Sequence, residues 1–355
     1  MTRPIAARRG WWWRVGIYLL MALIMVAMHA VQWWQPHRTR SSVWSDEQAA
    51  LRLLDQQITP PRLMSAVVQE PALGIALILL VLLALGAWLA GGVLLASWWS
   101  AGRLALPCAS KSVPAVPVIW SMGDVLRIAM LGLFAAHMLP AMQLVHVVRH
   151  QPTDLHEWIL ASMLTLDGTV LVAVFVMAAR RLGARWPRAI GWRTRRWWQS
   201  VGQGLVGYVA TIPPLSIAVL IVVVLATAFR YEPPPEPVLG LLLNETRWSV
   251  LLAGSLFIAV LGPVVEETFF RGVLYAALRR RWGVRWGLLA SGVCFAALHT
   301  TPVGFLPIWL LGVVLAYLYE TTGSLVPSIT LHILHNTAIL ASVWLTKGML
   351  GVMGR

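Results

Sequence analysis

Two adjacent glutamates, Glu266 and Glu267 in the stretch VVEETFFRG, interrupt an apolar part of the sequence. No charged side chain lies between Trp248 and Val265, so both carboxylates fall where a membrane span is expected. A carboxylate inside a bilayer costs at least roughly 2.5 kcal/mol, which points to a functional role. On a helix, Glu267 shares a face with Arg271, whereas Glu266 is rotated by about 100°. We therefore predict that Arg271 holds Glu267 and that Glu266 is left for chemistry.

The depth of Glu266 matches that of a histidine in the next span. Thirteen residues, about 20 Å of helix, separate Glu266 from Arg279 in the following basic cluster. This distance argues against the alternative that the glutamates mark the cytoplasmic end of a span. His299, in FAALH, lies about 21 Å beyond Arg285 along the following antiparallel span. A lone intramembrane histidine usually makes a hydrogen bond between helices, but the matched depth favours a glutamate–histidine pair.

A third polar motif, HILHN, lies in the last span. His332 and Asn336 share a helical face, while His335 is about 60° from His332 and is interpreted as a packing residue. If Pro327 is the first helical residue, His332 lies roughly 10 Å inside the cytoplasmic end. Asp167 stands alone in an earlier span, and we expect it to pack or to support the site.

The composition excludes an ordinary soluble domain. The chain is 58% apolar and 12% charged, with a mean hydropathy of +0.72, whereas soluble domains carry about 25% charge. The predicted fold is an all-α polytopic transmembrane helical bundle of about nine spans. The expected spans are 15–35, 72–102, 128–148, 158–179, 197–229, one beginning at 248, two within 286–319 that are divided at TTPVGFLP (300–307), and 321–346.

The net charge of +14 comes from arginines that cluster between spans. Residues 180–196 carry seven Arg and no acid, and residues 271–285 carry five Arg. Under the positive-inside rule, these segments and the N-terminus are cytoplasmic. We therefore expect contacts with anionic lipids at the cytoplasmic Arg clusters, and no nucleic-acid partner. Most of the 20 tryptophans lie near span ends, as in an interfacial belt.

The chain divides at a proline-rich stretch, YEPPPEP (231–237). The predicted parts are a five-span membrane region of unknown role (1–230), an outer linker (231–247), a four-span core with most of the unusual polar residues (248–346) and a tail (347–355). The first span follows four arginines, but it is long for a signal peptide and no A-x-A site follows, so we expect an uncleaved anchor. A short amphipathic helix is expected at 45–57 in the first outer loop. Two cysteines, Cys108 and Cys294, make a disulfide framework improbable.

Three motifs in order, each on its own apolar span, resemble one family. Glu-Glu-x-x-x-Arg, Phe-x-x-x-His and His-x-x-x-Asn are similar to the motifs of the CAAX prenyl protease and bacteriocin-processing (CPBP) family of intramembrane endopeptidases, over about residues 248–346. The resemblance implies a membrane-embedded protease acting on a membrane-associated peptide or protein. It implies that Glu266 and His299 activate water, that His332 and Asn336 stabilise the oxyanion, and that Glu267 and Arg271 complete the first motif. The Arg- and Trp-rich loops suggest a bacterial cytoplasmic (inner) membrane.

Elementary chemistry supports these roles and leaves alternatives. A glutamate in a low dielectric becomes a stronger base, and imidazole or carboxamide donors to an oxyanion are worth about 2.7–4 kcal/mol each. We predict no cofactor; the alternative is zinc held by Glu266, His299 and His332, although Asn336 is a poor zinc ligand and no H-E-x-x-H is present. The alternative function is a non-catalytic membrane scaffold or bacteriocin-immunity protein. A proton-coupled transporter fits less well, because the first half lacks the repeats and broken helices that it predicts.

Overall fold

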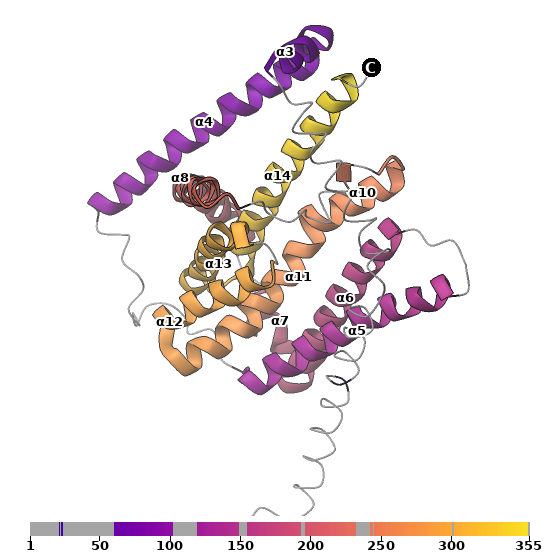
Figure 1. The fold of residues 1–355 in the computed structure, drawn as a ribbon. Coiled ribbons are helices and arrows are strands. Elements are labelled where there is room, and N and C mark those ends of the chain that lie inside the picture. The colour runs from indigo at the N-terminus through magenta and orange to yellow at the C-terminus, as the bar shows by residue number, and fades with distance from the viewer. Residues whose placement is uncertain are drawn as a thin grey trace, which may run out of the picture.

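The computed structural model describes residues 21, 23, 60–101, 119–148, 155–192, 196–231, 242–243, 245–299 and 302–353. The regular elements within these ranges are helices (Figure 1), which confirms the predicted all-α fold. They are α3 (Pro60–Gln69), α4 (Pro71–Ser100), α5 (Met122–Val148), α6 (Leu155–Leu182), η1 (Gly183–Arg185), α7 (Trp186–Ala189), α8 (Trp197–Ala228), α10 (Trp248–Leu256), η2 (Phe257–Leu261), α11 (Gly262–Phe269), η3 (Phe270–Tyr275), α12 (Ala276–Ala297), α13 (Pro302–Thr322) and α14 (Leu325–Met353).

Six stretches of helix among the described residues are long and apolar enough to cross a membrane. One of them, Trp248–Ala297, contains the predicted sixth and seventh spans, and α5 occupies the place of the third. The chain is therefore a multi-pass membrane protein, while nine spans with a cytoplasmic N-terminus stay a prediction. The first span, the helix at 45–57 and most of the proline-rich linker lie outside the described residues. Helix α3 was not predicted.

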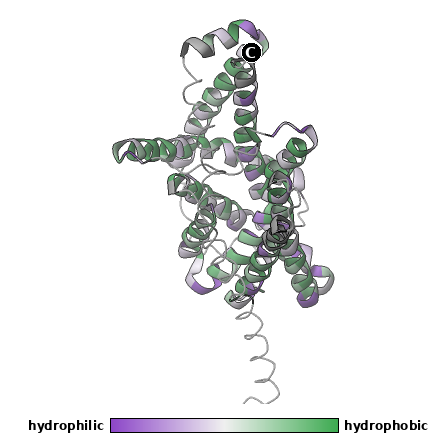
Figure 2. Cartoon of the chain, turned by 45° about the vertical axis from the view of Figure 1, so that its right-hand side comes forward, coloured by the Kyte–Doolittle hydropathy of each residue, from purple (hydrophilic) through white to green (hydrophobic). Residues whose placement is uncertain are grey.

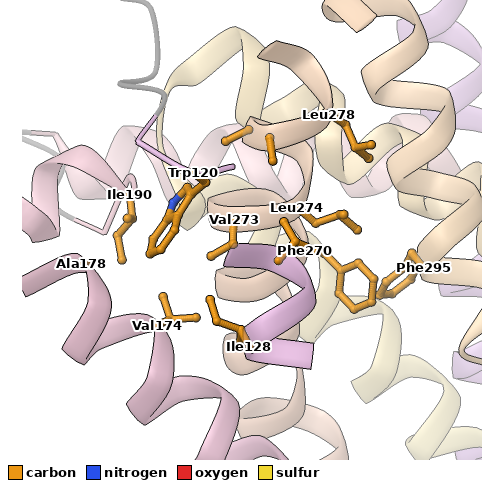
Figure 3. Close-up of a cluster of buried hydrophobic side chains, with 13 residues drawn as sticks. Trp120, Ile128, Val174, Ala178, Ile190, Phe270, Val273, Leu274, Leu278 and Phe295 are labelled. Atoms are coloured by element: carbon orange, nitrogen blue, oxygen red, sulfur yellow. The ribbon is translucent and has the colours of Figure 1, made fainter. Parts of the chain in front are cut away.

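The glutamate-bearing helix runs through the middle of the bundle. In Figure 1, α4 lies on one flank and the α5–α6 pair on the other, with α10 to α14 between them. Helix α8 joins α4 to α13 and α14, and α6 packs against α11. A buried apolar cluster that includes Ile128, Val174, Phe270 and Val273 ties α5 and α6 to η3 (Figure 3). Apolar residues line the spans on most sides (Figure 2), as contact with lipid requires.

Glycines shape the hairpin that follows the glutamates. Gly283 has φ +78°, a left-handed conformation that favours glycine, and the chain reverses there between the two predicted spans. Gly292 and Gly312 then let α12 and α13 approach closely: a Cβ on Gly312 would lie 3.0 Å from Gly292 Cα. The predicted division at 300–307 is also found, since α12 ends at Ala297 and α13 begins at Pro302.

Segments that the charge pattern assigned to one side of the membrane do lie together. The Leu325 amide donates to the Gly191 carbonyl at 2.9 Å, which joins the basic 180–196 segment to the start of α14. At the other end, Lys347 Nζ donates to the Leu242 carbonyl at 2.8 Å. The predicted start of the last helix was wrong by two residues: α14 begins at Leu325, where the Ser324 hydroxyl accepts from the Val326 amide as a cap, so Pro327 is its third residue.

Candidate active site

A fully buried ion pair anchors the site. Arg271 Nη1 donates to Glu267 Oε1 at 2.7 Å, and both side chains are 0% exposed. The predicted pairing of Glu267 with Arg271 is therefore confirmed. The same carboxylate oxygen lies 2.9 Å from His332 Nδ1 on α14. Because Glu267 is an acceptor bound to a guanidinium, Nδ1 must carry the proton and donate.

Glu266 has different surroundings from its neighbour. Its side chain is 32% exposed, and its Oε2 atom is buried without a hydrogen-bond partner among the described residues. The nearest ring nitrogen, His332 Nε2, is 3.7 Å from Oε2, which is too long for a direct hydrogen bond. Glu267 is thus held by Arg271 and by His332 of α14, whereas a chemical role for Glu266 stays a prediction.

Aromatic rings and a backbone carbonyl hold Arg271 in place. Its guanidinium lies 4.5 Å from the Phe295 ring centroid and 5.7 Å from that of Phe270. Nη2 donates to the Gly312 carbonyl at 3.2 Å, which the close approach of α12 and α13 makes possible. Arg271 itself lies in η3, a π-helical segment, and such segments occur often at functional sites.

His299 lies just beyond α12, where its orientation is fixed by the preceding turn. Its Nδ1 is 2.8 Å from the Phe295 carbonyl, so Nδ1 donates and Nε2 of the neutral ring keeps a lone pair. The His299 and Phe295 ring centroids are 4.8 Å apart, and Phe295 also packs edge-on against His332 at 5.6 Å. Phe295 is thus a neighbour shared by both predicted site histidines.

Asn336 connects α14 to a second π-helical segment. Its Nδ2 donates to the Ile258 carbonyl at 2.9 Å, within η2. Pro263 follows this segment and has no backbone N–H, so the regular helical ladder is interrupted there and a carbonyl is left for a side chain. The carboxamide has a second N–H that this contact does not use.

Other residues separate into those that face the site and those that do not. His335 packs against Tyr208 and lines an apolar cavity of about 390 Å³ beside α8, so its interpretation as a packing residue agrees with its position. The central role of Phe295 was missed, although its place in FAALH was a signal. Asp167 was noted as a solitary charge; it lies half-buried on α6, which packs against α11, and sequence spacing could not reveal this packing.

The predicted zinc alternative does not fit the described arrangement. In the part of the chain that the structure describes, no group of three His, Cys, Asp or Glu side chains could hold a metal ion. The Nδ1 atoms of His299 and His332 are engaged by Phe295 and Glu267, and His332 Nε2 is 3.7 Å from Glu266.

The site lies in a bundle of apolar helices, several of which are long enough to cross a membrane. Residues 247–338 match the family model of the Rce1-like type II CAAX prenyl endopeptidases. The resemblance to the CPBP family is thereby confirmed, and the match supports an intramembrane endopeptidase with a peptide or protein substrate. Searches among curated proteins and among solved structures found no match.

Proposed function

We propose that this protein is a CPBP-type intramembrane endopeptidase that hydrolyses a peptide bond in a membrane-associated peptide or protein. The observation that carries the proposal is the division of roles between two adjacent glutamates. Glu267 is locked by Arg271 and His332, whereas Glu266 has an unpartnered oxygen beside a histidine. A locked carboxylate gives rigidity, and a free one accepts a proton.

In the proposed reaction, Glu266 removes a proton from a water molecule whose orientation His299 Nε2 assists. The water oxygen attacks the carbonyl carbon, and the resulting oxyanion accepts hydrogen bonds from His332 and Asn336. Collapse of this intermediate breaks the C–N bond, and the proton held by Glu266 passes to the leaving amine.

The hydrogen bonds add one condition to this scheme. Nδ1 of His332 already donates to Glu267, so Nε2 can donate to an oxyanion only when the ring is an imidazolium. The ring lies between two carboxylates, with Nδ1 2.9 Å from Glu267 Oε1 and Nε2 3.7 Å from Glu266 Oε2. Asn336 has no such condition, because its second N–H is a donor at any pH.

The setting of the proposed enzyme is a bacterial cytoplasmic membrane, with anionic lipid at the basic segments 180–196 and 271–285 and with no nucleic-acid partner. The seven and five arginines of these segments support this placement.

The test is cleavage of a membrane-anchored reporter peptide library by the purified chain in vesicles. Glu266→Gln and His299→Ala should each abolish cleavage and leave the protein folded, because they remove chemistry and not packing. Glu70→Gln, an exposed position on the loop before α4, is the matched control and should cleave normally. Normal cleavage by Glu266→Gln would refute the proposal. A wild-type chain that cleaves no library member, yet protects cells from a membrane-active peptide, would favour the immunity function.

A further inference from the structure

A groove that the proposed reaction does not use lies between α4, α8 and α13. Helix α8 packs against both of the other helices, and Figure 1 shows α4 on the flank of the bundle beside α8. The cavity has a volume of about 630 Å³, within the range of about 300–1,000 Å³ that is usual for ligand sites. The described residues that line it include none of the candidate catalytic residues, so the groove is separate from the active site.

Close helix contacts at a few positions set the shape of the groove. A Cβ on Gly91 would lie 2.8 Å from Cδ of Pro213, so α4 and α8 touch there. A Cβ on Gly207 would lie 3.1 Å from Leu318, where α8 meets α13. Nearer the start of α8, a Cβ on Gly202 would meet nothing within 4 Å outside its own stretch of helix, although Gly202 lines the cavity. The space around Gly202 is therefore open to a ligand.

The groove is polar at one end and apolar at the other. Gln199 and Gln203 lie in the first two turns of α8, and Thr321 and Thr322 end α13. The hydroxyl of Thr211, deeper in the groove, donates to a carbonyl of α8 itself. The other residues farther along α8 and nearer the middle of α13 are apolar: Val206, Ala210, Pro214 and Val314. A phospholipid has the same gradient, from a polar headgroup to an apolar chain.

The polar end lies beside the basic segment 180–196. Helix α8 follows this segment directly, and the Tyr319 hydroxyl, near the end of α13, donates to the Ile190 carbonyl at 3.4 Å. Trp98, another residue of the groove, lies near the C-terminal end of α4, and tryptophans are common at the membrane interface. All three helices thus bring the polar end of the groove to the same basic surface.

One cation and several hydrogen-bond donors gather at this end. Arg196 Nη1 donates to Gln199 Oε1 at 3.5 Å, so the carboxamide oxygen is engaged and its N–H groups remain as donors. Within the described ranges, no hydrogen bond engages the Gln203 carboxamide or the Tyr317 hydroxyl, and both residues line the groove. The phosphate and ester oxygens of a phospholipid are acceptors, which complement this set of donors.

The length of the groove matches one acyl chain. Gln203 and Pro214 are separated by about 16 Å of helix, and half of the hydrocarbon core of a bilayer is about 15 Å thick. A free phosphate or another soluble anion would use only the polar end. The apolar part therefore favours a lipid as the occupant.

We propose that this groove binds an anionic phospholipid of the cytoplasmic leaflet, with its headgroup at Arg196 and Gln199 and one acyl chain between α4 and α13. Basic pockets between membrane-spanning helices on the cytoplasmic side recognise such headgroups. The bound lipid joins α4, whose most apolar stretch is only 6% buried in protein, to the rest of the bundle. Because the site needs no peptide cleavage, it can be tested apart from the proposed function.

Gly202→Leu tests the groove by filling it. Dioleoyl phosphatidylglycerol is titrated into the purified full chain in detergent, and native mass spectrometry measures the lipid adducts. The wild-type chain should bind one molecule tightly, and Gly202→Leu should bind it at least about tenfold more weakly, because the new side chain occupies the space of the acyl chain. Gly86→Leu is the matched control: a Cβ there also meets nothing within 4 Å, but Gly86 lies on α4 outside the groove, so binding should be unchanged.

Arg196→Gln tests the headgroup contact. It should weaken binding about fivefold, the effect of one arginine at an anionic surface. Arg281→Gln, at an exposed position of the other basic segment, is the matched control and should bind as the wild type does. The wild-type chain should prefer phosphatidylglycerol over dioleoyl phosphatidylcholine, which has the same chains, and Arg196→Gln should remove most of this preference.

A photoreactive acyl chain on phosphatidylglycerol tests the site without any substitution. Cross-links in the wild-type chain should map to residues of the groove such as Leu95, Val206 and Leu318. Cross-links confined to other faces, or equal binding by Gly202→Leu and the wild type, would overturn the proposal. Equal affinity for phosphatidylcholine would refute the anionic headgroup. Displacement of the lipid by the membrane-anchored reporter peptide would assign the groove to the substrate, and a protein dimer in place of the lipid adduct would assign it to a second copy; each result would also overturn the proposal.

Discussion

Helix α4 and the helix that carries the glutamates are both long enough to cross a membrane, but they differ in how much of their surface other helices cover. In the most apolar part of Trp248–Ala297, 44% of residues are buried in protein, against 6% in Pro71–Ser100. Charge follows this difference: Glu266, Glu267 and Arg271 lie in the enclosed helix, while α4 carries no charged residue. Two apolar spans thus have different surroundings: protein encloses much of the span that carries the glutamates, whereas α4 is left to face lipid.

The comparison shows how the chain tolerates charge at this depth. The two fully buried charged groups of the enclosed helix have specific partners from other helices, His332 for Glu267 and the Gly312 carbonyl for Arg271. Most residues of α4 are exposed, and lipid around such a helix has no hydrogen bonds to offer.

The largest effect is expected from uncoupling the buried pair. Glu267→Gln should lower the free energy of unfolding by about 3–5 kcal/mol, because Arg271 keeps its charge without a carboxylate. Glu266→Gln should change it by less than about 1 kcal/mol, since Glu266 is in no such pair. Denaturant titration of the purified protein in micelles measures both. Equal losses in the two variants would show that the adjacent glutamates do not differ in role.

The sequence was sufficient for those features that depend on local helical spacing. The pairing of Glu267 with Arg271 follows from a separation of four residues, and the reversal between spans follows from the basic stretch around Gly283. His299 and His332 both pack against Phe295, while the matched depth of Glu266 and His299 stays a prediction.

Contacts between segments that are distant in the chain could not be predicted from the sequence. The bond from Asn336 to Ile258 depends on a π-helical carbonyl, and the position of Asp167 depends on how α6 packs against α11. The start of α14 was misjudged because Pro327 is compatible with several positions in the first turn, whereas the capping Ser324 is identified only by its contacts.

The next effect concerns turnover. Asn336→Ala should lower kcat by about 10²–10³-fold with little change in KM, because an oxyanion donor acts in the transition state. His332→Ala should show the same loss and an additional loss of stability, since this ring also binds Glu267. Steady-state kinetics with the reporter peptide distinguishes the cases: an increase in KM alone would place Asn336 in substrate binding.

Chelation is the companion experiment for the zinc alternative. We expect purified protein to hold no stoichiometric metal and to keep its activity under strong chelation. If zinc is essential, chelation should abolish cleavage, added zinc should restore it, and His332→Ala should reduce metal occupancy while Asn336→Ala should not. One zinc per chain that tracks activity would replace the metal-free mechanism and keep the protease.

A smaller effect is expected at Asp124, which precedes the predicted third span. Burial raises its pKa, but hydrogen bonds from Arg181 and Ser121 outweigh burial and lower the pKa to about 2. A lowered pKa in the folded state stabilises the protein above the ordinary value of 3.8, and this contribution is lost as the pH falls toward 2. Wild type should exceed Asp124→Asn by about 1 kcal/mol at neutral pH, because Arg181 is partly exposed. Unfolding curves that stay equally far apart at pH 6 and pH 2 would contradict this.

The smallest effect is expected on the lipid-facing side of α4. Leu82 is 58% exposed, and its neighbours in a bilayer are lipid tails in both the folded and the unfolded inserted state. Truncation by Leu82→Ala should therefore change stability by less than about 0.5 kcal/mol. Leu331→Ala, at a fully buried position of α14, is the matched control and should cost about 2–5 kcal/mol. A loss at Leu82 comparable to the loss at Leu331 would mean that α4 packs against protein in the membrane, and the contrast between the enclosed helix and α4 would then have to be abandoned.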